Sequence, residues 1–576
     1  MYISNYRRKA EAVFLFVLFF LILCIGRLLY IQFFNSAYLA DIARKQHNFF
    51  VELEPLRGVI YDTNFKPQTL NLPADSLYAS PNNIKDNDKE RIIRSLSSIL
   101  NFNPDYLRDR LNRKKSFVWI ARKITPEQAQ AVKKLNIKGL GFLRESKRSY
   151  PNTYLASQII GFAGLDNTGL EGIELYLDKY LRGEPGWAIY LRDARQKRLD
   201  IWEKMVLPKD GDDIVLTIDQ VIQYIAEREL DKAFKEFHAK GASIIVLDPH
   251  TGRILALANR PSYDLNEHSN VSKDEKRNRA ICDLFEPGSV FKIVTASAAL
   301  EEKRVTEEDR FFCENGSYRV ANHILHDHTP HGWLTFREVI EESSNIGTTK
   351  IAQVLGSEIV YKYVRLFGFG SKLGIDLPGE ISGMIKEPRY WSKTSIGAVP
   401  IGQEVGVTAL QLASAFSVIA NGGQLMKPYI IEEVRDKQGE VIRKAQPKLI
   451  RKVLSLDTAA RMTKMLTGVV EEGTGKMAQI PGVTSAGKTG TAQKLDSNGA
   501  YSHNKFVASF VGFAPVEDPL VTIVVSLDEP HPSYYGGVVA APVFSAVAGD
   551  VVRYLKTKQA LFSNEEYNLN ARRRIN

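Results

Sequence analysis

The sequence predicts an α+β protein that one N-terminal helix attaches to a membrane. Its 576 residues exceed a single ordinary domain, so we expect two or more folded units. In the second half of the chain, strand-like segments lie on both sides of a long, mostly helical middle. A composition of 25% charged and 44% hydrophobic residues excludes a mainly disordered chain and a membrane protein of many spans.

A long apolar segment follows a basic flank at the N-terminus. Residues 7–9 read Arg-Arg-Lys, and an unbroken apolar stretch runs from Ala12 to Gly26, continuing past Arg27 to Phe34. A membrane helix needs about 20 apolar residues, and a basic flank stays in the cytoplasm. A cleaved secretory signal is the alternative, but the stretch is too long and no clear Ala-x-Ala site follows it. We expect an uncleaved single-pass anchor, with everything after residue 35 outside the cytoplasm.

The region after the anchor mixes both kinds of secondary structure. "FFVELEPLRGVIYD" is strand-like, whereas "KERIIRSLSSIL" and "TPEQAQAVKKL" space their apolar residues as helices do. The polar stretch "VLPKDGDD" marks a junction. The predicted divisions are a cytoplasmic N-terminus at 1–10, an anchor at 11–34, an α+β accessory domain at 35–210, a main domain at 211–556 and a polar C-terminal tail at 557–576.

The main domain begins with a helix and two strands. "QVIQYIAERELDKAFKEF" predicts the helix, and "ASIIVLD" and "RILALAN" predict the strands. Two further strands, "FVASFVGFA" and "LVTIVVSLD", come near its end. Early and late strands around a helical middle indicate one antiparallel sheet covered by helices.

Charge and cysteines restrict the function classes. The net charge of +10 is spread along the chain, and no basic tract is longer than Arg572–Arg574, so nucleic-acid binding is not expected. The positive net charge is equally compatible with a protein that works next to an anionic cell envelope. Of three cysteines, Cys24 lies in the apolar run, which leaves Cys282 and Cys313 as the only conceivable disulfide. We favour two buried thiols.

The stretch "EPGSVFKIVTASAALEE" sets Ser289 three residues before Lys292. Ser after Pro-Gly is typical of a helix start, where its oxygen caps free N–H groups. Residues three apart also share one helix face, so the Lys292 amine could take the proton of the Ser289 hydroxyl. Taken alone, this stretch favours the role of Ser289 at a helix start over a catalytic role.

Two further motifs change that balance. "EESSNIGTTKIA" contains Ser343, Ser344 and Asn345, and "TSAGKTGTAQK" contains the run from Lys488 to Thr491. Each alone is weak, because the first is also typical of a polar helix end and the second of a strand-edge turn. The ordered set Ser-x-x-Lys, Ser-x-Asn, Lys-Thr-Gly occurs in penicillin-binding proteins and class A β-lactamases.

Nearly the whole chain after the anchor resembles class B penicillin-binding proteins, particularly the septal, cell-division type. "LRGVIYD", "RSYPN" and "GLEGIE" resemble the family's pedestal motifs. "GRILALANRPSYDLN", "RNRAICDLFEPGSVFK", "GQEVGVTALQLASAFSVIANGG" and "YYGGVVAAPVF" resemble its transpeptidase domain. Asp62–Phe65 replaces the family's Asp-Arg-Asn-Gly, which puts the tight turn in doubt, and Ser-Ser-Asn replaces the Ser-Asp-Asn of class A β-lactamases. The resemblance implies a penicillin-binding transpeptidase fold on a pedestal.

The chemistry needs an activated serine. A hydroxyl is a poor nucleophile at neutral pH, so Ser289 needs Lys292 as an unprotonated base. The resemblance implies that Ser343 passes a proton to the leaving nitrogen and that Asn345 bonds Lys292 or the substrate amide. It also implies that Lys488 holds Ser343 and adds positive charge.

The last motif supplies the expected substrate contacts. By similarity to the family, Thr489 binds the terminal carboxylate of the substrate. Gly490 leaves room where a side chain would clash, and the backbone N–H groups of Ser289 and Thr491 form the oxyanion hole.

A run of histidines between the motifs suggests a metal site as an alternative. The spacing is loop-like rather than His-Glu-x-x-His on a helix, so we expect no metal and no other cofactor. We expect a rim loop ahead of the Ser343 helix instead. The residues concerned are His323, His326, Asp327, His328 and His331.

Together these observations predict a serine D,D-transpeptidase of septal peptidoglycan synthesis that β-lactams inhibit. Its substrates would be a D-Ala-D-Ala donor stem peptide and an amine acceptor. The resemblance adds divisome membrane proteins, including a SEDS-type glycan polymerase, as partners. An elongation-type relative, a D,D-carboxypeptidase or β-lactamase, and a β-lactam sensor remain alternatives. A sensor would need several spans and a cytoplasmic output domain, whereas one span and about ten preceding residues are predicted.

Overall fold

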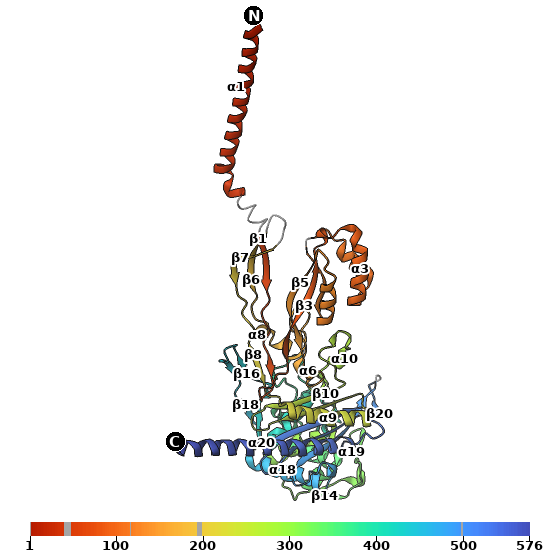
Figure 1. The fold of residues 1–576 in the computed structure, drawn as a ribbon. Coiled ribbons are helices and arrows are strands. Elements are labelled where there is room, and N and C mark those ends of the chain that lie inside the picture. Colours follow the sequence, from red (N-terminus) through yellow and green to blue (C-terminus); the bar gives the residue numbers. More distant parts are fainter. Residues whose placement is uncertain (1, 40–47, 116, 193–197, 497–498, 576) are drawn as a thin grey trace. The chain divides into compact units, whose positions relative to one another are not determined.

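The computed structural model divides the chain into two compact units (Figure 1). One comprises residues 1–56 and 183–210, and the other comprises 57–182 and 211–576. The structure describes residues 2–39, 48–115, 117–192, 198–496 and 499–575.

The first unit holds the predicted anchor. Helix α1 (Tyr2–Leu29) continues as a π-helical turn (Tyr30–Phe34) with its large apolar side chains exposed. It is one of two helices in the described chain long and apolar enough to cross a membrane, and the other, Gly536–Leu561, is half-buried in the fold. The same unit holds the antiparallel sheet β1 (Asn48–Leu53), β6 (Gly186–Arg192) and β7 (Arg198–Val206).

The accessory part of the second unit is α+β, as predicted. Its sheet has β3 (Leu70–Ala79) between β4 (Val118–Ile124) and β5 (Leu140–Ser149). Apolar side chains of three helices pack with this sheet into a core of their own. These helices are α3 (Asp86–Leu100), α4 (Pro104–Leu111) and α5 (Pro126–Lys134).

The turn that lacks the family's glycine is nevertheless tight. Phe65 takes the left-handed conformation, with φ of 59°, where glycine is ordinarily favoured. The Asp62 carboxylate accepts from the N–H groups of Asn64 at 2.9 Å and Lys66 at 2.8 Å. The Arg435 guanidinium lies 4.9 Å from the centre of the Phe65 ring. Side-chain bonds therefore hold a turn that the backbone alone disfavours.

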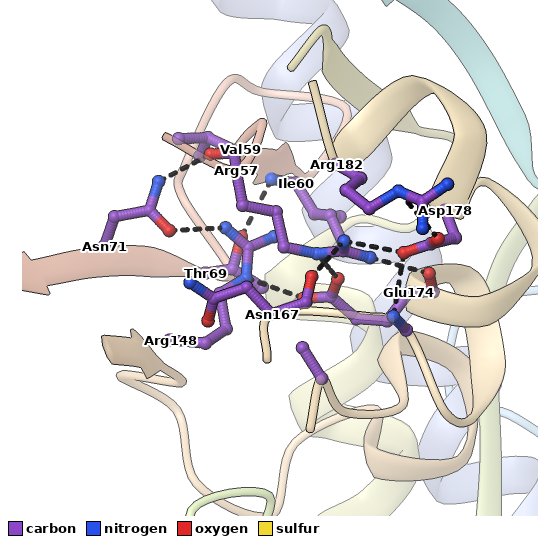
Figure 2. A network of polar contacts seen from close by, with 12 residues as sticks. Arg57, Val59, Ile60, Thr69, Asn71, Arg148, Asn167, Glu174, Asp178 and Arg182 are labelled. Atoms are coloured by element: carbon purple, nitrogen blue, oxygen red, sulfur yellow. Dashed lines mark hydrogen bonds and ion pairs between the residues drawn. The ribbon is translucent and has the colours of Figure 1, made fainter. Parts of the chain in front are cut away.

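Three pedestal stretches distant in sequence meet at one buried ion cluster (Figure 2). Arg57 donates to Glu174 Oε2 at 2.5 Å and to Asp178 Oδ1 at 2.7 Å. Arg148 donates to Glu174 Oε1 at 2.7 Å, and the Tyr150 hydroxyl to the same oxygen at 3.3 Å. Arg57 and Glu174 are 1% and 0% exposed, so the cluster is an interior feature.

The main domain is built on a five-stranded sheet whose neighbouring strands are all antiparallel, which confirms the predicted architecture. The four strands expected from the sequence are present, and the Lys-Thr-Gly segment adds an edge strand. The order is β10 (Ile254–Arg260), β9 (Gly241–Leu247), β21 (Val521–Asp528), β20 (Tyr501–Ala514) and β19 (Ala486–Leu495).

Helices cover both faces of this sheet. Alternate side chains of β9, such as Ile244 and Val246, pack in the core with α9 (Gln220–Glu236) and α20 (Ala541–Ile575). The intervening Ile245 belongs to the larger core on the opposite face. The helices of that core include α12 (Lys292–Glu301), α13 (Phe336–Glu341), α14 (Asn345–Leu355), α17 (Ala409–Ala420) and α18 (Leu456–Glu471). Of these helices, α12 begins at Lys292 and α14 begins at Asn345.

Candidate active site

Ser289 lies on a short 3₁₀ turn (Gly288–Phe291) directly before α12. It is partly exposed, whereas Val290 and Phe291 are fully buried and fix the turn. No side chain caps the start of α12, whose cap residue is Phe291. The role of a helix cap, which this stretch alone favoured, is therefore not the one that Ser289 has.

Lys292 is the first residue of α12 and is 0% exposed. Its Nζ donates to the Ser343 carbonyl oxygen at 2.5 Å and to Ser343 Oγ at 3.2 Å. Burial lowers the pKa of the Lys292 amine to about 7, against the opposing effect of Asp327. At neutral pH a large fraction of this amine is unprotonated, as a general base requires.

Ser343 lies in the turn between α13 and α14. Its φ of 59° is unusual for a residue with a side chain and costs about 1 kcal/mol or more. Ser344 caps α14, because its Oγ accepts from the Gly347 N–H at 2.9 Å. The strained turn directs the Ser343 carbonyl and hydroxyl toward Lys292.

Asn345 and Asp327 form the other side of this turn. Asn345 Nδ2 donates to the His326 carbonyl at 2.8 Å, so its partner here is the rim rather than Lys292. Asp327 Oδ1 accepts from the Asn345 N–H at 2.5 Å. The sequence places Asp327 in a metal site or a rim loop, and no local pattern predicts its bonds to the start of α14.

Lys488 on β19 is the second buried lysine of the site and is also 0% exposed. Its Nζ has no hydrogen-bond partner among the described residues. Burial, and then the nearby Lys292, hold its pKa well below that of an ordinary lysine, while Glu342 opposes them. Two charged amines repel each other, so the proximity of Lys488 favours the neutral form of Lys292, the expected base.

Gly490 lies where the turn that carries Ser289 approaches β19. A Cβ placed on it would come 3.0 Å from the Pro287 carbonyl oxygen and 2.5 Å from Ser509 Oγ. The missing side chain thus permits the contact between the strand and the turn that carries Ser289.

The two threonines of the strand are anchored from other elements. Thr489 Oγ1 shares a hydrogen bond of 2.9 Å with Thr474 Oγ1. Thr491 Oγ1 accepts from the Gly536 N–H at 3.0 Å. The structure therefore brings all three motifs together: Lys292 bonds to Ser343 and acts electrostatically on Lys488, and β19 lies against the Ser289 turn.

The histidine run forms part of the rim. His323 and His326 bound strand β13 (His323–His326), the His328 ring packs edge-on against Tyr535, and His331 Nε2 lies 3.9 Å from Glu342 Oε2. Among the residues that the structure describes, no three His, Cys, Asp or Glu side chains converge as a metal site requires.

All three cysteines are free thiols, as favoured from the sequence. Cys313 is fully buried below the site, and Ser344 Oγ lies 3.4 Å from its Sγ. Cys282 is only partly buried.

Two family models match most of the chain. The penicillin-binding protein transpeptidase domain matches residues 242–549, and the penicillin-binding protein dimerisation domain matches residues 52–216. Stage V sporulation protein D of Bacillus subtilis is 35% identical over 97% of this chain and 88% of its own length. Peptidoglycan D,D-transpeptidase FtsI of Escherichia coli is 32% identical over 93% of this chain and 90% of its own length.

Solved structures have the same fold. Penicillin binding protein 3 of Mycobacterium tuberculosis in complex with ampicillin has a TM-score of 0.69 and 28% identity, over 88% of this chain and 96% of that one. Penicillin binding protein 2X of Streptococcus thermophilus has a TM-score of 0.72 and 25% identity, over 89% of this chain and 81% of that one. With its transpeptidase and dimerisation domains, the chain belongs to the class B penicillin-binding proteins.

Proposed function

We propose that this penicillin-binding protein is a serine D,D-transpeptidase that cross-links peptidoglycan stem peptides during septal wall synthesis. The observation that carries the proposal is Lys292, buried next to the Ser289 turn, where burial lowers its pKa to about 7. Ser289 Oγ attacks the carbonyl of the D-Ala-D-Ala bond, and its proton moves to Lys292. Free D-Ala leaves after its nitrogen takes a proton through Ser343.

The acyl group then passes to an amine. An unprotonated amine of a neighbouring stem peptide attacks the ester, and Ser289 recovers its proton. In this scheme Thr489 binds the substrate carboxylate, and the N–H groups of Ser289 and Thr491 stabilise the oxyanion. A β-lactam acylates Ser289 by the same reaction, but the ester that it forms is stable.

The proposed arrangement in the cell follows the domain order. Residues 1–10 stay in the cytoplasm, 11–34 cross the plasma membrane once, and the pedestal (35–210) and transpeptidase domain (211–556) lie outside, followed by the tail (557–576). The partners are divisome membrane proteins, including a SEDS-type glycan polymerase. The septal role is the one that the resemblance of the sequence motifs to the cell-division type implies.

Two experiments test these statements. The purified protein, given a donor peptide ending in D-Ala-D-Ala and an amine acceptor, should release D-Ala and form the cross-linked product in equal amounts. Release of D-Ala without product would instead indicate a carboxypeptidase. A tagged copy should gather at midcell in dividing cells, and side-wall placement would contradict the septal role.

A further inference from the structure

Asp327 follows strand β13 and faces the first turn of α14. Its Oδ2 accepts from the Ser344 hydroxyl at 2.6 Å, while its Oδ1 accepts from the N–H groups of Asn345 at 2.5 Å and Ile346 at 3.1 Å. Bonds from N–H groups to a carboxylate are roughly twice as strong as neutral ones, and a helix start favours negative charge. One side chain from the rim therefore satisfies the beginning of α14.

These bonds act on the backbone next to Ser343. The Ser344 N–H donates to the Val339 carbonyl at 3.0 Å on one side, and Asp327 binds Ser344 and Asn345 on the other. Between these points the left-handed turn at Ser343 has little freedom. Its carbonyl oxygen consequently stays 2.5 Å from Lys292 Nζ.

We propose that Asp327 is a positioning residue of the active site, whose carboxylate ties the rim to the Ser343–Asn345 turn and holds Ser343 against Lys292. This inference rests on the proposed acyl transfer at Ser289 and assigns a role outside the three motifs.

The same carboxylate acts electrostatically on the base. Burial is the largest influence on the Lys292 amine and lowers its pKa, whereas Asp327 and Cys313 raise it. Lys488 faces Lys292 from β19, and Glu342 in turn faces Lys488. Removing the charge of Asp327 should therefore lower the pKa of Lys292, so the acylation curve should move to lower pH.

Asp327 also explains the middle residue of the motif. The Ser344 hydroxyl donates to Asp327, whereas an aspartate at position 344 would place a second carboxylate against it. Like charges at that distance repel, so Ser-Ser-Asn suits a chain whose carboxylate arrives from the rim.

The test is the rate at which fluorescent penicillin acylates the full-length protein between about pH 5 and about pH 9, which spans the ordinary range of such bases. Asp327→Asn keeps the shape and removes the charge. We expect a fall of about tenfold to a hundredfold in the plateau rate, because misplaced catalytic groups lose that much. We also expect the midpoint of the curve of acylation rate against pH to move to lower pH.

Two further variants make the result specific. Ser344→Ala removes the bond to Asp327 and the cap bond from the Gly347 N–H while keeping the Asp327 charge, so it should lower the plateau rate and leave the midpoint pH in place. Asp219→Asn is the matched control, because Asp219 caps α9 in the same way, accepting from the Val221 N–H at 2.9 Å, and lies on the other helix layer. The Asp219→Asn variant should change neither the plateau rate nor the midpoint pH of acylation.

The outcomes separate the inference about Asp327 from the proposed function of the protein. A midpoint for Asp327→Asn equal to that of the unaltered protein overturns the inference, even if the plateau falls, because a purely structural role predicts that result. If Asp327→Asn does not fold, an unchanged plateau for Ser344→Ala overturns it. If the unaltered protein is never acylated, the proposed function fails and the inference with it.

Discussion

At the scale of single residues, the site depends on burying amines that water would keep charged. Lys292 and Lys488 have no exposed surface, and burial is the largest cause of the lowered pKa of both. A buried charged group without a carboxylate partner is costly, so such a pair is rarely retained for stability alone. Its presence beside a partly exposed serine is therefore evidence of catalysis.

The pKa of Lys292 predicts the pH dependence of acylation. A lowered lysine pKa means that the neutral, proton-accepting form becomes dominant as the pH rises through about 7. The acylation rate should thus climb through that pH and level off above it, which stopped-flow fluorescence with labelled penicillin can follow. A rate that stays constant from acid to alkaline pH would exclude Lys292 as the base.

Charge alone at position 292 should not support the reaction. Lys292→Arg keeps a cation but introduces a guanidinium that stays protonated, so acylation should slow by about a hundredfold or more. Circular dichroism should show an unchanged fold. Labelling of this variant at the ordinary rate would mean that the base lies elsewhere.

At the scale of elements, the site depends on how closely the Ser289 turn approaches β19. Gly490→Ala would place a Cβ 3.0 Å from the Pro287 carbonyl oxygen and 2.5 Å from Ser509 Oγ, so the turn or the strand must move. Displacement of about 1 Å can slow catalysis about a hundredfold.

The measurement is the acylation rate, with Gly332→Ala as the control. A Cβ at Gly332 meets no heavy atom closer than 3.8 Å, so that variant should react normally. Equal rates for Gly490→Ala and the control would show that the close approach is not needed.

Elements with clear periodicity could be predicted from the sequence, and those set by distant contacts could not. Apolar spacing located α9, β9, β10, β20 and β21, and the anchor helix. Strand β19 was less evident, because its Lys-Thr-Gly segment lacks an alternating apolar pattern. The role of Asp327 depends on bonds to residues 17 to 19 positions away, which no local pattern encodes.

At the scale of the whole molecule, the accessory region depends on one buried ion cluster. Arg57, Arg148 and Glu174 come from three stretches that the sequence identified only by resemblance, and none is more than 7% exposed. Glu174→Ala would leave both guanidinium groups without their shared carboxylate. Breaking a buried pair in this way lowers the free energy of unfolding by about 3–5 kcal/mol.

Denaturant unfolding of the purified protein can measure this loss. Glu184→Ala is a suitable control, because the Lys209–Glu184 pair is 74% and 76% exposed and exposed pairs contribute about 1 kcal/mol or less. Similar losses for the two variants would contradict a structural role for the cluster.

The central claim is that Ser289 is the nucleophile, and it is tested most directly by mass spectrometry of a digest after reaction with a β-lactam. The peptide that contains Ser289 should gain the mass of the intact drug, and Ser289→Ala should remain unmodified while keeping its fold. Modification of a different peptide, or labelling that survives Ser289→Ala, would contradict the account.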